Sequence, residues 1–169
     1  MRLLTARGYS LLIALLLVVL MVGRFGAGTA GAQDAEVRHA TGTFAVTMTP
    51  GDEESVQADI GLSRYVLSKT FEGGISGVSS GQMLAGGPPG SQTVGTYVAL
   101  ERVVGTLDGR TGAFLLAHRG DMNAEGYSLS ITVVPGSGTG ELSGLTGEFG
   151  LTIADGVHHY DLAYRLPGQ

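Results

Sequence analysis

A ten-residue stretch occurs twice in the chain, as residues 105–114, GTLDGRTGAF, and as residues 140–149, GELSGLTGEF. Both copies place apolar residues on either side of a glycine-rich centre. This pattern is typical of a strand, a tight turn with positive φ and a returning strand. Residues 73–83, GGISGVSSGQM, form a looser third copy. The repeat period is that of a hairpin plus its connection, so the sequence predicts hairpins that close on one another.

The rest of the chain also has the character of strands. In residues 41–48, Phe44, Val46 and Met48 alternate with smaller residues, which is the two-residue period of a half-buried strand. Further strands are predicted at residues 62–71, 74–84, 93–107, 111–119, 127–134 and 157–166, with a hairpin over 140–154. No helical period persists, and the chain contains 29 glycines. We therefore expect an all-β fold, a closed antiparallel barrel of about eight strands over residues 41–169, because closure hides the sheet edges.

The N-terminus has the order of a secretory signal peptide. Arg2 and Arg7 precede an apolar run at residues 11–22, and Ala30-Gly31-Ala32 follows. The run is shorter than the roughly 20 residues that span a bilayer, which disfavours an uncleaved membrane anchor. We expect a signal peptide at residues 1–32, a flexible lead-in at 33–40, and a secreted or cell-envelope protein whose membrane contact is limited to the N-terminal segment.

Charge narrows the choice of partner. The full chain has a net charge of −5. Residues 1–32 contain three arginines and no acidic residue, so their removal makes the net charge more negative. Lys69 is the one lysine. Such a surface repels phosphate backbones, so nucleic acid is not an expected partner. The chain has no cysteine and therefore no disulfide framework.

Three stretches resemble a bacterial family known as domain of unknown function 3224: residues 97–110 (YVALERVVGTLDGR), 135–145 (PGSGTGELSGL) and 155–160 (DGVHHY). The fold of that family is similar to the allene oxide cyclase barrel, an eight-stranded antiparallel barrel shared with plant dirigent proteins. The resemblance implies a barrel with a cavity, and it transfers no catalytic residues.

The repeat predicts one inward histidine. Aligning Phe114 with Phe149 also aligns His118 with Ile153, on a face whose other members are apolar and therefore point into the core. A buried imidazole can act as an acid or a base. The alternative is a structural histidine that hydrogen-bonds to a neighbour.

Glu101 and Arg102 must lie on opposite faces of one strand. If Tyr97 and Glu101 face inward, Glu101 can join His118 in moving a proton, with its pKa raised by desolvation. If Arg102 faces inward instead, it can bind a ligand carboxylate. The sequence leaves both alternatives open, together with a purely structural ion pair.

The last predicted strand places His158, Tyr160 and Tyr164 on one face, where they can line the cavity mouth and bind a ligand. His159 and Asp161 lie on the other face and provide too few ligands for a metal site. The nucleophile-elbow pattern at residues 77–81 and the glycines at 136–140 both lack the helix that their chemistry requires. We expect neither a metal nor a cofactor.

The function expected from these features is the binding of a small, mostly apolar organic ligand by an exported barrel, with His118 and Glu101 as candidate catalytic residues for a cyclisation or isomerisation. Shape, exclusion of water and a few polar groups suffice for such reactions. The alternatives are a non-catalytic carrier barrel and a structural cell-envelope module with a filled interior. A homo-oligomer is compatible with all three.

Overall fold

The computed structural model describes residues 36–51, 61–89, 91 and 93–168. The predicted signal peptide at residues 1–32 lies outside the described residues, and so do residues 33–35 of the predicted lead-in. The strands in chain order are β1 (Arg38–Pro50), β2 (Leu62–Gly73), β3 (Ile75–Gly86), β4 (Gly95–Leu107), β5 (Arg110–Asn123), β6 (Gly126–Val133), β7 (Thr139–Gly140), β8 (Thr146–Ala154) and β9 (Val157–Arg165).

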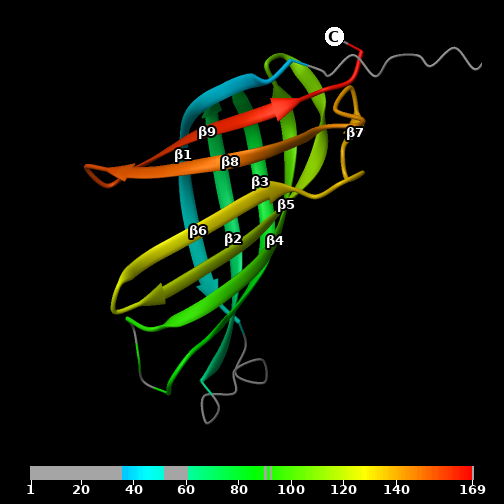
Figure 1. Cartoon of the computed structure of the whole chain (residues 1–169). Coiled ribbons are helices and arrows are strands. Elements are labelled where there is room, and N and C mark those ends of the chain that lie inside the picture. Colours follow the sequence, from blue (N-terminus) through cyan, green and yellow to red (C-terminus); the bar gives the residue numbers. More distant parts are fainter. Residues whose placement is uncertain (1–35, 52–60, 90, 92, 169) are drawn as a thin grey trace, which may run out of the picture. The chain divides into compact units, whose positions relative to one another are not determined.

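Eight of these strands form a closed antiparallel barrel, as predicted (Figure 1). The hydrogen-bonded order runs β4-β3-β2-β1-β9-β8-β6-β5, and pairing of β4 with β5 closes the ring. The short β7 pairs with β5. The described part of the chain contains no helix long and apolar enough to cross a membrane.

The repeated sequence stretch has the same local roles in both copies. Leu107 and Leu142 are buried, and so are Phe114 and Phe149. The central glycines, Gly109 and Gly144, have φ values of 83° and 80°, in the left-handed region that favours glycine. In the first copy Asp108, with φ 47°, joins Gly109 in the tight β4–β5 hairpin turn.

The second copy is not a hairpin, so that part of the prediction is wrong. Its first arm, β7, pairs with β5 through Gly112↔Gly140 and Ala113↔Thr139, whereas β8 pairs with β9. Between the arms, Leu142 and Leu145 turn into the main core cluster and are buried. Burial of these two leucines replaces the cross-strand pairing that a hairpin would provide.

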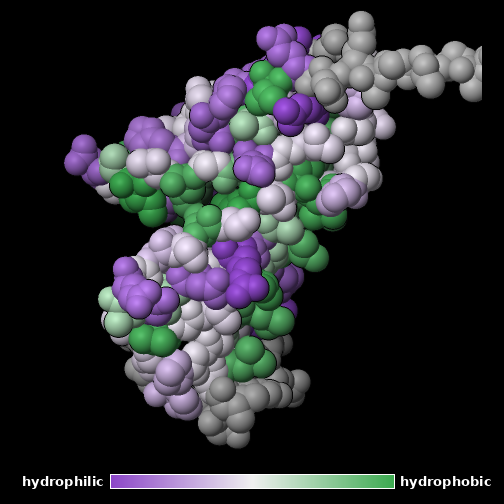
Figure 2. Space-filling view, in the orientation of Figure 1, coloured by the Kyte–Doolittle hydropathy of each residue, from purple (hydrophilic) through white to green (hydrophobic). Residues whose placement is uncertain are grey.

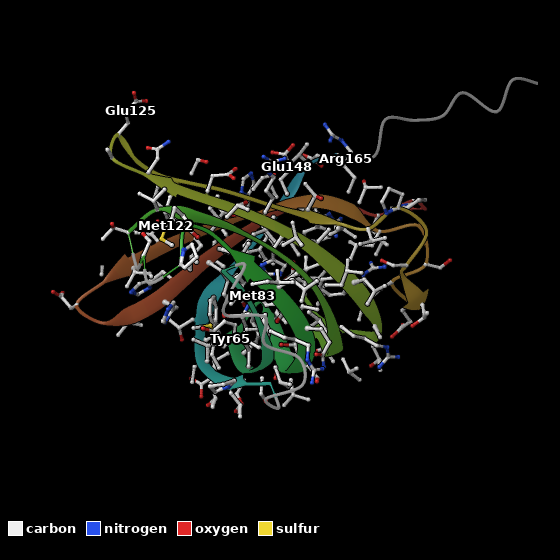
Figure 3. All side chains as sticks on the ribbon, turned by 90° about the horizontal axis from the view of Figure 1, so that it is seen from below. Tyr65, Met83, Met122, Glu125, Glu148 and Arg165 are labelled. Carbon is white, nitrogen blue, oxygen red and sulfur yellow. The ribbon has the colours of Figure 1, made fainter. Side chains whose placement is uncertain are left out.

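The interior is filled on one side and hollow on the other. Phenylalanine, leucine and tyrosine side chains form the main core cluster, including a set of tilted and stacked rings around Phe71 and Phe149. A second, smaller cluster contains Leu67, Met83 and Ala99. In Figure 3, Tyr65 and Met83 lie within the ring of strands, whereas Glu125 and Arg165 point away from it.

One seam of the barrel is nearly unpaired. A single residue pair, Thr132↔Glu148, joins β6 to β8, whereas twelve pairs join β3 to β4. Beyond this pair the β5–β6 and β8–β9 hairpins diverge (Figure 1), and the molecular surface is indented between them (Figure 2). The interior is therefore accessible from this side.

Candidate functional site

The hollow part of the barrel is a cavity of about 850 Å³. Its wall is mostly apolar and comes from all eight barrel strands, with Phe44, Leu67, Met83, Ile131 and Leu151 among its residues. Side chains from both sides of the open seam, Tyr127 of β6 and Ile153 of β8, also line it. A cavity of this size and character is typical of small-molecule sites.

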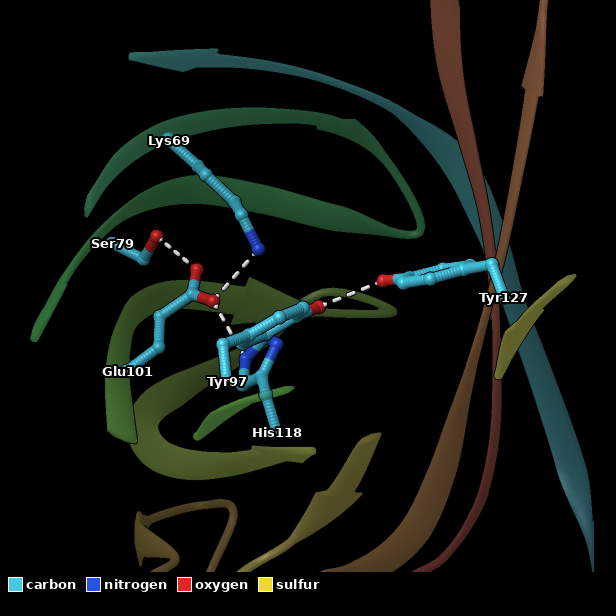
Figure 4. A network of polar contacts seen from close by, with 6 residues as sticks. All are labelled: Lys69, Ser79, Tyr97, Glu101, His118 and Tyr127. Carbon is cyan, nitrogen blue, oxygen red and sulfur yellow. Dashed lines mark hydrogen bonds and ion pairs between the residues drawn. The ribbon is translucent and has the colours of Figure 1, made fainter. Parts of the chain in front are cut away.

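Four polar side chains meet at the wall of this cavity, one from each of the adjacent strands β2, β3, β4 and β5 (Figure 4). Lys69 Nζ donates to Glu101 Oε2 at 2.7 Å. The hydroxyl of Ser79 donates to Glu101 Oε1. His118 Nε2 lies 3.0 Å from Glu101 Oε2. We call Lys69, Ser79, Glu101 and His118 the polar cluster.

Strand register brings the polar cluster together. Lys69 and Ser79 are directly paired across β2 and β3, and Glu101 is opposite Gly81 across β3 and β4. A Cβ at Gly81 would lie 3.0 Å from both Cα and Cβ of Glu101. The absence of a side chain at Gly81 therefore leaves room for the glutamate beside it.

The carboxylate of Glu101 is ionised. Burial alone would raise its pKa, but the contacts with His118, with the Lys69 charge and with Ser79 together lower the pKa from 4.5 to about 2. The expectation of a raised pKa is therefore wrong, because it left out two of the three partners. Glu101 is a fixed anion and not a store for a proton.

The contact between His118 and Glu101 is close but is not a regular hydrogen bond. Nε2 is buried, and its N–H direction makes no regular hydrogen bond within the described structure, although Oε2 lies at 3.0 Å. The contact is therefore mainly electrostatic.

Lys69 and His118 face the cavity, whereas Glu101 lies behind them. Lys69 and His118 line the cavity, and each has 7% of its surface exposed. Glu101 is fully buried and does not line the cavity. Lys69 Nζ also lies 4.6 Å from the centre of the Phe44 ring, at cation–π distance. A molecule in the cavity would thus meet an ammonium and an imidazole, both held by one carboxylate.

Two tyrosines form a second polar contact on the cavity wall. The hydroxyls of Tyr97 and Tyr127 lie 3.0 Å apart, joining β4 to β6 across β5. Gly120 of β5 permits this bridge, since a Cβ there would lie 2.1 Å from the Tyr97 ring. Burial, followed by the contact with Tyr127, raises the pKa of Tyr97, so its phenol stays protonated.

The structure separates the other predicted site residues. His158 lines the cavity and stacks on Phe44 with ring centres 4.9 Å apart. Tyr160 and Tyr164 share its face, but both are buried in the main core cluster away from the cavity. The Tyr160 hydroxyl accepts from the Ile75 amide at 2.7 Å, and the Tyr164 hydroxyl donates to Asp108 at 2.7 Å. Their polar atoms serve the fold.

Arg102 is exposed on the outer face of β4. The arrangement in which Arg102 faces inward is therefore wrong, and the one with Tyr97 and Glu101 inside is observed. The strand pairs with its neighbours so that Ala99, Glu101 and Val103 point to the interior, and alternation then sends Arg102 outward.

Lys69 and Ser79 were missed by the sequence reasoning. Lys69 shares a strand face with Leu67 and Phe71, both buried, so the one lysine of the chain interrupts an apolar face. That interruption is a usable signal for an inward charge. Ser79 is the serine of the nucleophile-elbow pattern at residues 77–81, which was rejected because it lacks the required helix; that pattern gave no indication of a contact with Glu101.

Comparisons with known proteins agree with this architecture. The family model described as protein of unknown function (DUF3224) matches residues 40–164. A crystal structure of a protein with unknown function from that family, from Shewanella oneidensis MR-1, is 38% identical and superposes with a TM-score of 0.69, covering 78% of this chain and 98% of that chain. No curated protein matches the chain. The chain therefore belongs to the DUF3224 family.

Proposed function

We propose that this barrel binds a small, mostly apolar organic molecule and guides its isomerisation or cyclisation by proton transfer. The observation that carries the proposal is the 850 Å³ apolar cavity with Lys69 and His118 in its wall. A structural module with a filled interior would have no cavity above roughly 300 Å³. The cavity volume therefore argues against that alternative.

His118 is the candidate proton-transfer group. In its neutral form the imidazole can accept a proton from an acidic C–H of the ligand and return it to another atom of the same molecule. The Lys69 ammonium can stabilise the negative charge that develops in between. Such a reaction consumes no co-reactant, because every proton removed is returned, and an apolar cavity strengthens both interactions.

A non-catalytic carrier is the second candidate. Its support is that Lys69 and His118 are both held by the buried Glu101 carboxylate, an arrangement that also suits a fixed binding site. In a carrier, the polar cluster would only orient the ligand.

Binding is tested with a neutral naphthylamine dye whose fluorescence increases in apolar surroundings. Ala85 lines the cavity, so we expect Ala85→Phe to reduce dye affinity at least about tenfold, roughly 1.4 kcal/mol. Ala45→Phe, the same change at an exposed position of β1, is the matched control and should leave affinity unchanged. Equal affinity in the two variants would count against a cavity site.

Proton transfer is tested with 2-tetralone, an apolar ketone with acidic C–H groups, by following uptake of deuterium from D₂O with NMR. An isomerase should accelerate uptake, and His118→Gln should reduce the acceleration at least about tenfold while the dye still binds. Dye binding without any acceleration in the wild type would favour the carrier.

The proposal also places the protein outside the cytoplasm, on the strength of the predicted signal peptide at residues 1–32. N-terminal sequencing of the protein recovered from its host is the test. We expect a mature chain that begins at Gln33, and an intact N-terminus on cytoplasmic protein would contradict export.

A further inference from the structure

We infer that the ligand carries an oxygen acceptor, a carboxylate or a carbonyl, and that the polar cluster selects it against amines and other cations. This inference rests on the proposed binding function and specifies the chemistry of the ligand. It follows from the hydrogen-bonding capacity that the polar cluster leaves unused.

Lys69 provides the spare donors. A protonated lysine has three N–H donors, and one of them is used by Glu101 Oε2 at 2.7 Å. The ammonium also lies over the Phe44 ring, which stabilises the charge without supplying an oxygen. Since Lys69 lines the cavity, a remaining N–H can bind an oxygen of a molecule there.

The carboxylate oxygens of the polar cluster are already occupied. Glu101 Oε1 accepts from Ser79, and Oε2 accepts from Lys69 with His118 Nε2 at 3.0 Å. Glu101 is fully buried behind Lys69 and His118, so a ligand in the cavity does not reach its oxygens. At this place the wall therefore offers the donors of Lys69 while the carboxylate stays out of reach, so an oxygen on the ligand is the group that Lys69 can bind.

The tyrosine pair also has one donor to offer. When one of the Tyr97 and Tyr127 hydroxyls donates to the other across 3.0 Å, the accepting hydroxyl keeps its own hydrogen. Burial keeps the Tyr97 phenol protonated. An oxygen at the far end of a longer ligand would find a donor here.

Charge excludes the opposite choice of ligand. An ammonium on the ligand would lie next to Lys69 in an apolar cavity, where like charges repel much more strongly than in water. It would also leave the spare lysine donor without an acceptor, and an unsatisfied polar group in such a place destabilises the complex. A carboxylate or carbonyl oxygen avoids both penalties.

The test compares four naphthalene derivatives with the same apolar body: an acetic acid, a methyl ketone, an aminomethyl compound and an ethyl hydrocarbon. Each is used to displace the neutral dye from the mature protein, residues 33–169, at pH 7. We expect the acid and the ketone to displace the dye at concentrations at least about tenfold below the amine, and the comparison of acid with ketone identifies the preferred oxygen group.

Two variants connect this preference to the polar cluster. Lys69→Met with Glu101→Gln removes both charges together, which avoids an unpaired buried charge, and should reduce the preference to within about threefold. Arg102→Met, on the outer face, should keep it in full. Equal or better displacement by the amine, or a preference that survives in the double variant, would overturn the inference while leaving ligand binding intact. A dye that does not bind at all would instead overturn the proposed function and this inference with it.

Discussion

Glu101 is the residue that organises the site, because it holds a lysine, a serine and a histidine from three neighbouring strands. Alternation along β4 predicts that one of two neighbouring charged residues, Glu101 or Arg102, is buried. Only the register of β4 against its neighbours decides that it is Glu101. Its ionisation could not be anticipated, because that depends on Lys69 and Ser79, which lie 32 and 22 residues away in the sequence.

The ionisation of Glu101 predicts how stability depends on pH. At pH 7, Glu101→Gln leaves Lys69 without its buried partner and should lower the free energy of unfolding by about 3 kcal/mol. The pKa of Glu101 is lowered on folding from 4.5 to about 2, so its contribution is present above pH 4.5 and is lost as the pH falls toward 2. Denaturant unfolding of wild type and variant should therefore converge over this range. A difference in stability that stays constant down to pH 2 would contradict the ionised carboxylate.

Strand β3 supports the site through Ser79 and also through the missing side chain at Gly81. A methyl group at Gly81 would approach the Leu100 carbonyl oxygen to 2.7 Å and Glu101 Cβ to 3.0 Å. We expect Gly81→Ala to destabilise the protein by about 2 kcal/mol and to weaken the preference for oxygen acceptors, because Glu101 must move.

The control for Gly81→Ala is Gly150→Ala on β8, where the nearest atom, the Asp161 carbonyl oxygen, is 3.4 Å away. That change should alter stability by less than about 1 kcal/mol. Similar melting temperatures and ligand preferences for both variants would show that β3 does not support Glu101 in the way described.

At the level of elements, sequence predicted more than it did for the site. Alternation and the Asp108-Gly109 turn were enough to predict the β4–β5 hairpin. The same ten-residue stretch at residues 140–149 predicted a hairpin that does not exist: β7 pairs with β5, and Leu142 and Leu145 are buried in the main core cluster. Burial of these leucines depends on the tertiary packing of the main core cluster, which no local pattern reveals.

For the whole molecule, the β6–β8 seam is expected to be the least stable part of the barrel. One residue pair joins these strands, so alternate amides of β6 facing the seam lack a strand partner. Hydrogen exchange followed by NMR should show faster exchange in residues 127–131 than in residues 77–86 of β3, which are paired with β2 on one side and with β4 on the other. Equal protection of β3 and β6 would mean that the seam is closed in solution.

The most direct test of the account is to extract the protein, purified from its own host, with organic solvent and to analyse the extract by mass spectrometry. We predict a small, mostly apolar molecule with a carboxylate or carbonyl group, present with the wild type and with Ala45→Phe but lost from Ala85→Phe. An extract from the wild type that contains no such molecule in repeated preparations, or one that is unchanged by Ala85→Phe, would contradict a ligand in this cavity.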